Sequence, residues 1–114
     1  MNHVLRCTDA AERLVVLTNE RWHNHILVDH AEMRSLLWAI ERVIIDPDQV
    51  NQDSEFHNRE VYYLFSVAGT RGNRHIKVCV EYADDVSTYD DAGQVITAYV
   101  THSIKSSEVL KWRK

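Results

Sequence analysis

The sequence lacks features that several classes of protein require. Its two cysteines, Cys7 and Cys79, are too few and too far apart for a disulfide framework in a chain of 114 residues, so we expect reduced thiols. No apolar run approaches the roughly 20 residues that span a bilayer. Residues 1–10 contain Arg6 and Asp9 and have no apolar segment of a secretory signal. We therefore expect a cytoplasmic protein with no membrane partner.

Motifs of common enzyme classes are also missing. The chain has three glycines, no glycine-rich phosphate loop, no GxSxG elbow, no HExxH and no CxxC. His25 and His30 are five residues apart, which is roughly 500° around a helix, so they do not stack as zinc-binding pairs spaced by four do. We therefore expect neither a metal site nor a cofactor.

The composition fits one globular domain over residues 1–114. Apolar residues make up 45% and charged residues 26% of the chain. The net charge of −4 argues mildly against a nucleic-acid binder. However, acidic residues gather in two stretches, 46–55 and 84–91, and the last ten residues hold four basic residues against a single acidic one, Glu108. A cationic surface elsewhere is therefore compatible with the sequence.

Two helices are predicted in the first half of the chain. Thr18 is a suitable N-cap for a helix that contains Trp22, Ile26 and Leu27 at helical spacing. A second helix is predicted from about residue 31 to residue 45, because its apolar residues repeat every three or four positions. The only proline, Pro47, ends this helix.

The second half of the chain has the period of two that is typical of strands. Strands are predicted at 61–67, 74–82 and 94–102, with a turn at 69–73 and short strands at 13–17 and 109–112. We therefore predict an α+β fold in which two N-terminal helices pack on one face of a four- to five-stranded antiparallel sheet. Strand alternation places five residues on its less apolar face: His75, Lys77, Thr97, Tyr99 and Thr101.

Three of the seven histidines lie close together, at positions 23, 25 and 30. Imidazoles transfer protons near neutral pH, and with a nearby cation they suit cleavage of a phosphodiester through the ribose 2′-hydroxyl. The alternative is that these histidines are ordinary surface or half-buried residues of a helix. Arg74, which flanks the predicted turn, is either a phosphate contact or a solvated side chain.

Several segments resemble those of a known family. They read RWHNHI at 21–26, HAEM at 30–33, DPDQV at 46–50, HIKVCVEY at 75–82, VITAYVT at 95–101 and IKSSEVL at 104–110. In content and order they resemble the phage BECR-like nucleases of the barnase–EndoU–colicin–RelE superfamily, over roughly residues 13 to 112. Ala31 stands where that family often has proline.

The resemblance implies a small ribonuclease of phage or toxin type. Such an enzyme cleaves RNA without metal and leaves a 2′,3′-cyclic phosphate. It implies that His25 or His30 is catalytic, together with sheet residues Lys77, Thr97 and Thr101. It also implies that Arg21, Tyr99 and Lys105 contact the substrate, with Arg74 as a further candidate.

Two functions of different class follow from the sequence. The first is an RNA endonuclease, for which the acidic net charge favours a discrete RNA such as a tRNA. The second is a non-catalytic binding protein on the same scaffold, such as an inhibitor of a host-defence complex or an antitoxin-like partner. The expected protein partners are a cognate antitoxin, an immunity protein or a host-defence protein. The enzyme hypothesis predicts that His25, Lys77 and Thr97 meet in one concave site.

Overall fold

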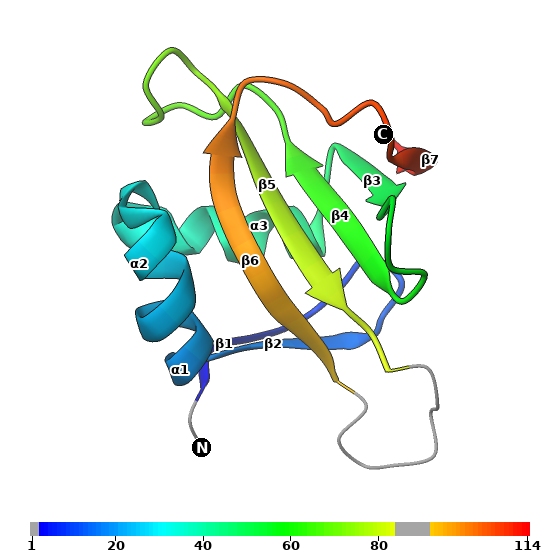
Figure 1. The fold of residues 1–114 in the computed structure, drawn as a ribbon, viewed down its shortest axis with the longest axis horizontal. Helices are drawn as coiled ribbons and strands as arrows, with labels where there is room; N and C mark the ends of the chain where they lie inside the picture. The colour runs from blue at the N-terminus through cyan, green and yellow to red at the C-terminus, as the bar shows by residue number, and fades with distance from the viewer. Residues whose placement is uncertain (1–2, 84–91) are drawn as a thin grey trace.

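A seven-stranded sheet forms the centre of the molecule (Figure 1). The computed structural model describes residues 3–83 and 92–114, so the acidic residues Asp84, Asp85, Asp90 and Asp91 lie outside the described residues. The strands are β1 (His3–Thr8), β2 (Leu14–Thr18), β3 (Gln49–Gln52), β4 (Arg59–Leu64), β5 (His75–Glu81), β6 (Gly93–Thr101) and β7 (Val109–Arg113). They lie in the order β1-β2-β6-β5-β4-β3-β7.

The predicted arrangement of the sheet was wrong in size and direction. The sheet has seven strands, and it is mixed because β2 runs parallel to β6 while every other neighbouring pair is antiparallel. β1 and β3 were not predicted because neither has a clear alternation of apolar and polar residues, and β3 has only four residues. The parallel pairing joins segments about 75 residues apart, which a local pattern cannot reveal.

The helical segments are shorter than predicted. α1 (Asn19–Arg21), a π-helical turn η1 (Trp22–Ile26) and α2 (Leu27–Asp29) follow one another, and the Thr18 hydroxyl caps the first as expected. The predicted second helix is divided at Leu36 into a 3₁₀ segment η2 (Ala31–Ser35) and α3 (Leu37–Ile45). No helix within residues 3–83 and 92–114 is long and apolar enough to cross a membrane.

The two helical groups occupy different positions against the sheet, which corrects the predicted packing of both on one face. In Figure 1, α3 lies behind β4 and β5, whereas α1 and α2 lie beside β6. β2 pairs with only two positions at the start of β6, so the remaining edge of β6 is open to the helical segment. There the backbone N–H of Val100 donates to the Glu32 carboxylate at 3.4 Å, and this bond ties η2 to the sheet.

The hydrophobic core lies between α3 and the sheet. α3 contributes Ala39, Ile40, Val43 and Ile44, which agrees with the predicted apolar stripe, while Leu37 is only partly buried. The sheet contributes alternate residues of its central strands, namely Tyr62, Leu64, Ile76, Val78, Val80, Val95 and Ala98. The intervening residues of the same strands therefore face the other side of the sheet.

Candidate functional site

The face of the sheet away from α3 carries a row of polar side chains. In the strand register, Lys77 of β5 lies opposite Tyr63 of β4 and Tyr99 of β6, and Cys79 lies opposite Thr97. Residues that are directly opposite one another in a sheet share a face. Lys77, Thr97 and Tyr99 therefore lie on one face, as strand alternation predicted.

Lys77 is held in a buried ion pair. Its ammonium lies 2.7 Å from a carboxylate oxygen of Glu108, in the segment that leads into β7, and the Glu108 side chain is 1% exposed. Burial alone would lower the pKa of Lys77, but the hydrogen bond to Glu108 and nearby Tyr63 and Tyr99 outweigh it and raise that pKa. Lys77 is therefore held in its charged form.

Glu108 also organises its surroundings through its second oxygen. That oxygen accepts a hydrogen bond of 2.5 Å from the Tyr63 hydroxyl and one of 3.2 Å from the Asn51 side-chain amide. Burial and the hydrogen bond to Glu108 raise the pKa of Tyr63, so its phenol stays protonated. We call Asn51, Tyr63, Lys77, Tyr99 and Glu108 the Lys77 cluster.

His30 reaches this cluster from the helical side. It lies between α2 and η2, and its ring stacks on Tyr99 with centroids 4.9 Å apart and an interplanar angle of 25°. The Lys77 ammonium lies 5.6 Å from the centre of the same Tyr99 ring. The His30 Nδ1 is 3.8 Å from a Glu32 carboxylate oxygen. Tyr99 thus contacts both a proton-transfer group and a cation.

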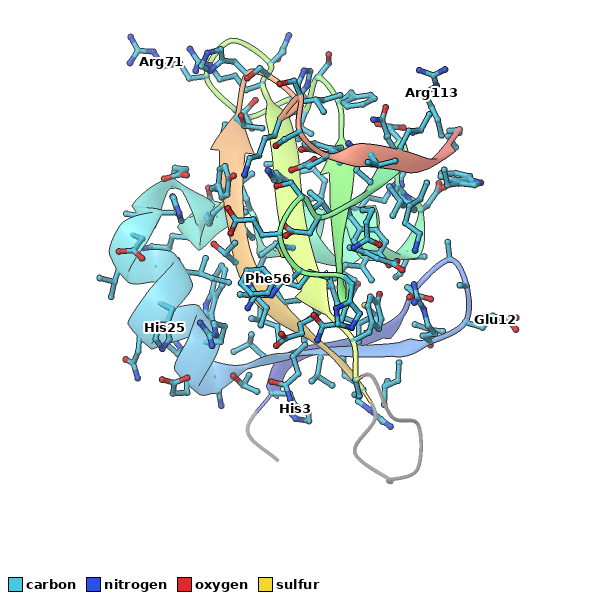
Figure 2. All side chains as sticks on the ribbon, turned by 45° about the vertical axis from the view of Figure 1, so that its right-hand side comes forward. His3, Glu12, His25, Phe56, Arg71 and Arg113 are labelled. Carbon is cyan, nitrogen blue, oxygen red and sulfur yellow. The ribbon has the colours of Figure 1, made fainter. Side chains whose placement is uncertain are left out.

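His25 occupies a different environment from His30. It lies in the exposed π-helical turn, and the partner found for its ring among the described residues is Glu20, at 2.9 Å (Figure 2 labels its position). Both side chains of this contact are exposed. Of the two histidines that the sequence left open, the structure brings His30 to the Lys77 cluster, and the expected meeting of His25 with Lys77 and Thr97 stays a prediction.

The remaining predicted residues lie around this face. Thr97 and Thr101 are half-buried on β6, and the Thr101 hydroxyl donates to the Ser103 carbonyl at 3.1 Å. Lys105 is exposed in the segment before β7. Arg21 ends α1, where its backbone N–H donates to Thr18. Arg21 is therefore placed on the helical segment rather than on the sheet.

Arg74 lines a cleft of about 460 Å³ between η2 and the β4–β5 loop. Arg71 and Glu32 line the same cleft, and Glu32 is the carboxylate that lies next to His30. Both arginines are exposed, and Arg74 contacts His102 at 3.3 Å. Cationic groups therefore adjoin the His30 side of the sheet.

His75 shares the face of Lys77 but is fixed in one tautomer. Its Nδ1 accepts a hydrogen bond of 3.0 Å from the backbone N–H of Ser66, so the ring proton sits on Nε2. Phe65 packs edge-on against the same ring, with centroids 5.0 Å apart. These contacts give His75 a role in holding the β4–β5 connection.

A second polar cluster lies on the other face of the sheet. Asp9, at the end of the β1 segment, accepts hydrogen bonds from the Arg13 guanidinium at 2.9 Å and the Tyr82 hydroxyl at 2.7 Å. The Arg13 guanidinium also binds Glu60 at 2.7 Å, and the Tyr62 hydroxyl lies 2.6 Å from that of Tyr82. We call these five residues, Asp9, Arg13, Glu60, Tyr62 and Tyr82, the Asp9 cluster.

The Asp9 cluster is internally satisfied. Burial raises the pKa of both Tyr62 and Tyr82, and so keeps both phenols protonated. Burial would also raise the pKa of Glu60, but hydrogen bonds from Arg13 and Lys111 outweigh it and lower that pKa. No side-chain polar atom buried in the described part of the chain lacks a partner. Its contacts tie β1, β2, β4 and β5 together, which is a structural role.

Histidines, cysteines and carboxylates do not form a metal-binding group among residues 3–83 and 92–114, where no three of them come together. The two cysteines are separate and free. Burial is the main cause that raises the pKa of each thiol to about 11, so neither is a reactive thiolate at neutral pH.

Sequence reasoning missed Glu108, Tyr63 and Asn51 as members of the site. The alternation of side chains along the predicted strand could have placed Tyr63 on the polar face, since its neighbour Tyr62 faces the core. Asn51 and Glu108 gave no such signal, because β3 was not predicted and Glu108 precedes a strand whose neighbour was unknown.

No protein-family model, curated protein or solved structure matches this chain.

Proposed function

We propose that the protein is a ribonuclease that cleaves RNA without metal, through the ribose 2′-hydroxyl, at the face that carries the Lys77 cluster. The contact of His30, Tyr99 and Lys77 is the observation that carries this proposal. A proton-transfer group, a phenol and an ammonium group held in its charged form lie together on one rigid face of the sheet there. This combination is what 2′-hydroxyl attack on a phosphodiester needs.

Each group has a role in the proposed reaction. The His30 imidazole removes the proton from the 2′-hydroxyl, which then attacks the phosphorus. The Lys77 ammonium stabilises the negative charge that develops on the phosphorane oxygens, because Glu108 keeps it protonated and fixed. The Tyr99 phenol, which lies beside both groups, supplies a proton to the leaving 5′ oxygen. The products are a 2′,3′-cyclic phosphate and a free 5′-hydroxyl.

The charged groups near His30 support binding of a polyanion despite the net charge of −4. Arg71 and Arg74 line the cleft that adjoins Glu32 and His30, and both are exposed. A phosphate next to the cleaved one can bind there. The small size of this cationic region favours a discrete RNA, such as a tRNA, over an extended RNA surface.

A non-catalytic binding protein is the second candidate. The observation that favours it is the Lys77–Glu108 ion pair, because a lysine neutralised by a buried carboxylate contributes less to phosphate binding than a free one. In that case the same face binds a macromolecule without chemistry. The protein partners expected from the sequence, an antitoxin, an immunity protein or a host-defence protein, belong to either candidate.

The proposal is tested by incubating purified protein with total RNA in the presence of EDTA. We expect cleavage, with 3′ ends that resist ligation until the cyclic phosphate is opened and removed. Loss of all activity in EDTA that zinc or manganese restores would contradict the metal-independent mechanism. Binding of RNA without cleavage would favour the second candidate.

A control must separate this activity from a contaminating nuclease. The His30→Ala variant, purified in parallel, should lose about 10²-fold in cleavage rate, as general acid–base groups typically do. His30 is half-exposed and its ring makes one stacking contact, so its removal should leave the fold intact. Equal cleavage by the variant and by the wild type would assign the activity to a contaminant.

A further inference from the structure

β7 is an open edge of the sheet. It is the last strand in the sheet order and pairs with β3 on one side only. All five of its residues are exposed, and three of them, Val109, Leu110 and Trp112, are large and apolar. An edge strand with unpaired backbone groups is a template for another strand, and natural edges are usually protected from such pairing.

A cleft of about 440 Å³ opens beside this edge. Apolar residues of three segments form half of its lining: Trp112 from β7, Val50 from β3, and Ala10 and Ala11 from the turn between β1 and β2. The other half consists of Arg13, Glu60, Tyr62 and Lys111. In Figure 2 that turn, marked by Glu12, and the end of β7, marked by Arg113, lie on the same side of the molecule. A strand bound to β7 could place a large apolar side chain in this cleft.

The accessible charges around the cleft are positive. The side chains of Arg13 and Lys111 are 41% and 43% exposed, whereas that of Glu60, to which both bind, is 11% exposed. Lys111 uses one of its three ammonium N–H groups on Glu60. Arg113 pairs with Gln49 and so lies on the face of β7 opposite to Trp112; it is exposed and forms no ion pair with a described residue, while Lys114 is balanced by Asp46. An incoming chain therefore meets cations with donors to spare.

These features disfavour two other occupants. A second copy paired through β7 in antiparallel fashion would bring Lys111 and Arg113 near their own equivalents, and like charges on paired strands repel. The phosphates of RNA would bind the cations. However, RNA cannot pair with an unpaired strand edge as another strand does, and its phosphates would also contact the apolar lining formed by Trp112 and Val50.

We propose that β7 and its cleft bind an extended acidic segment of another protein. The segment adds to the sheet as a strand beside β7, its carboxylates pair with Lys111 and Arg113, and an apolar side chain enters the cleft against Trp112. This site does not depend on the proposed ribonuclease activity. Trp112 lies opposite Val50, which faces the core, so the cleft is on the other side of the sheet from Lys77.

The test is a selection of binding peptides from a random peptide library on the immobilised full chain. We expect enriched peptides that alternate acidic and apolar residues and contain no proline in the bound segment. Lys111→Glu and Trp112→Ala should each weaken their binding by about tenfold or more, since a central aromatic and a charged contact are removed. Trp38→Ala is the matched control, because Trp38 on α3 is 55% exposed and Trp112 is 45% exposed.

Amide hydrogen exchange on the complex adds a readout of strand addition. Bound peptide should slow exchange of β7 amides that exchange freely in the unbound protein. Four results would overturn the proposal: no enriched peptide, enrichment of basic peptides, equal affinity in the Lys111→Glu and Trp112→Ala variants, or competition for the site by a short RNA. Formation of a dimer through β7 would assign the surface to a second copy instead.

Discussion

Each face of the central sheet holds a buried carboxylate that accepts hydrogen bonds from tyrosine and from a cation. On one face Asp9 binds Arg13 and Tyr82, and on the other face Glu108 binds Lys77 and Tyr63. The two clusters use similar groups at similar distances. They differ in what lies next to them.

The side-chain hydrogen bonds of the Asp9 cluster are made among its own members and with Lys111, and they join strands that are far apart in the sequence. The Lys77 cluster instead includes Tyr99 and adjoins His30, and both of these side chains are half-buried and so partly accessible to solvent. A buried charge network alone therefore does not mark a functional site. Contact with an accessible proton-transfer group is the feature that separates the two faces.

The largest effect on stability should come from Asp9. Asp9→Ala removes the acceptor of the Arg13 guanidinium and the Tyr82 hydroxyl, so we expect a loss of about 3–5 kcal/mol in the free energy of unfolding. Urea denaturation measures it. Glu12→Ala, which removes an exposed carboxylate from the same turn, should change stability by less than about 0.5 kcal/mol. Similar losses in both variants would show that the Asp9 cluster is not structural.

A smaller loss is expected at Gly93, which packs against Tyr82. A Cβ at position 93 would lie 2.6 Å from Cε1 of the Tyr82 ring, and Asp9 and Tyr62 hold the hydroxyl of that ring. Gly93→Ala should therefore cost about 1–3 kcal/mol. In a Tyr82→Leu background, Gly93→Ala should lower the free energy of unfolding by much less. Equal costs in both backgrounds would mean that the ring is not the obstacle.

A change in the Lys77 cluster should alter how the proposed RNA cleavage depends on pH. The hydrogen bond and charge of Glu108 oppose burial and raise the pKa of Lys77, so Glu108→Gln should lower that pKa. Lys77 would then lose its proton at a lower pH, and the alkaline limb of the rate profile should move to lower pH. An unchanged alkaline limb would show that the charge of Lys77 is not needed.

The contribution of the Asp9 cluster to the free energy of unfolding should decrease at acid pH. The pKa of Glu60 in the folded protein is below its ordinary value of 4.5, so its contribution to stability is present above that value and is lost as the pH falls through the folded pKa. The Glu60→Gln variant has no carboxylate at this position, so it does not take up a proton there as the pH falls. The difference in unfolding free energy between wild type and variant should therefore shrink below about pH 4.5. A constant difference would contradict the assignment to Glu60.

The sequence allowed the local parts of both clusters to be predicted. Strand alternation placed Lys77, Thr97 and Tyr99 on one face, and Thr18 was identified as the cap of α1. These predictions succeeded because they depend on the geometry of neighbouring residues along one strand or one helical turn. Two strands of the polar face, β5 with seven residues and β6 with nine, are the longest that the structure describes.

The remaining features depend on contacts between distant segments. The pairing of β7 with β3 brings Glu108 to Lys77, and no pattern near residue 108 reveals that pairing. The break at Leu36 divides the predicted helix, although the apolar repeat continues through it. Likewise, His25 and His30 fit the predicted chemistry equally well in the sequence. Only the packing of η2 against β6 distinguishes them.

The most direct test of the central claim compares the rates at which His30→Ala and His25→Ala cleave one defined RNA in EDTA. Both variants should fold with the stability of the wild type, since both side chains lie at or near the surface. The stacking of His30 on Tyr99 predicts a loss of about 10²-fold for His30→Ala and less than about threefold for His25→Ala. A large loss in His25→Ala with an intact rate in His30→Ala would contradict the site.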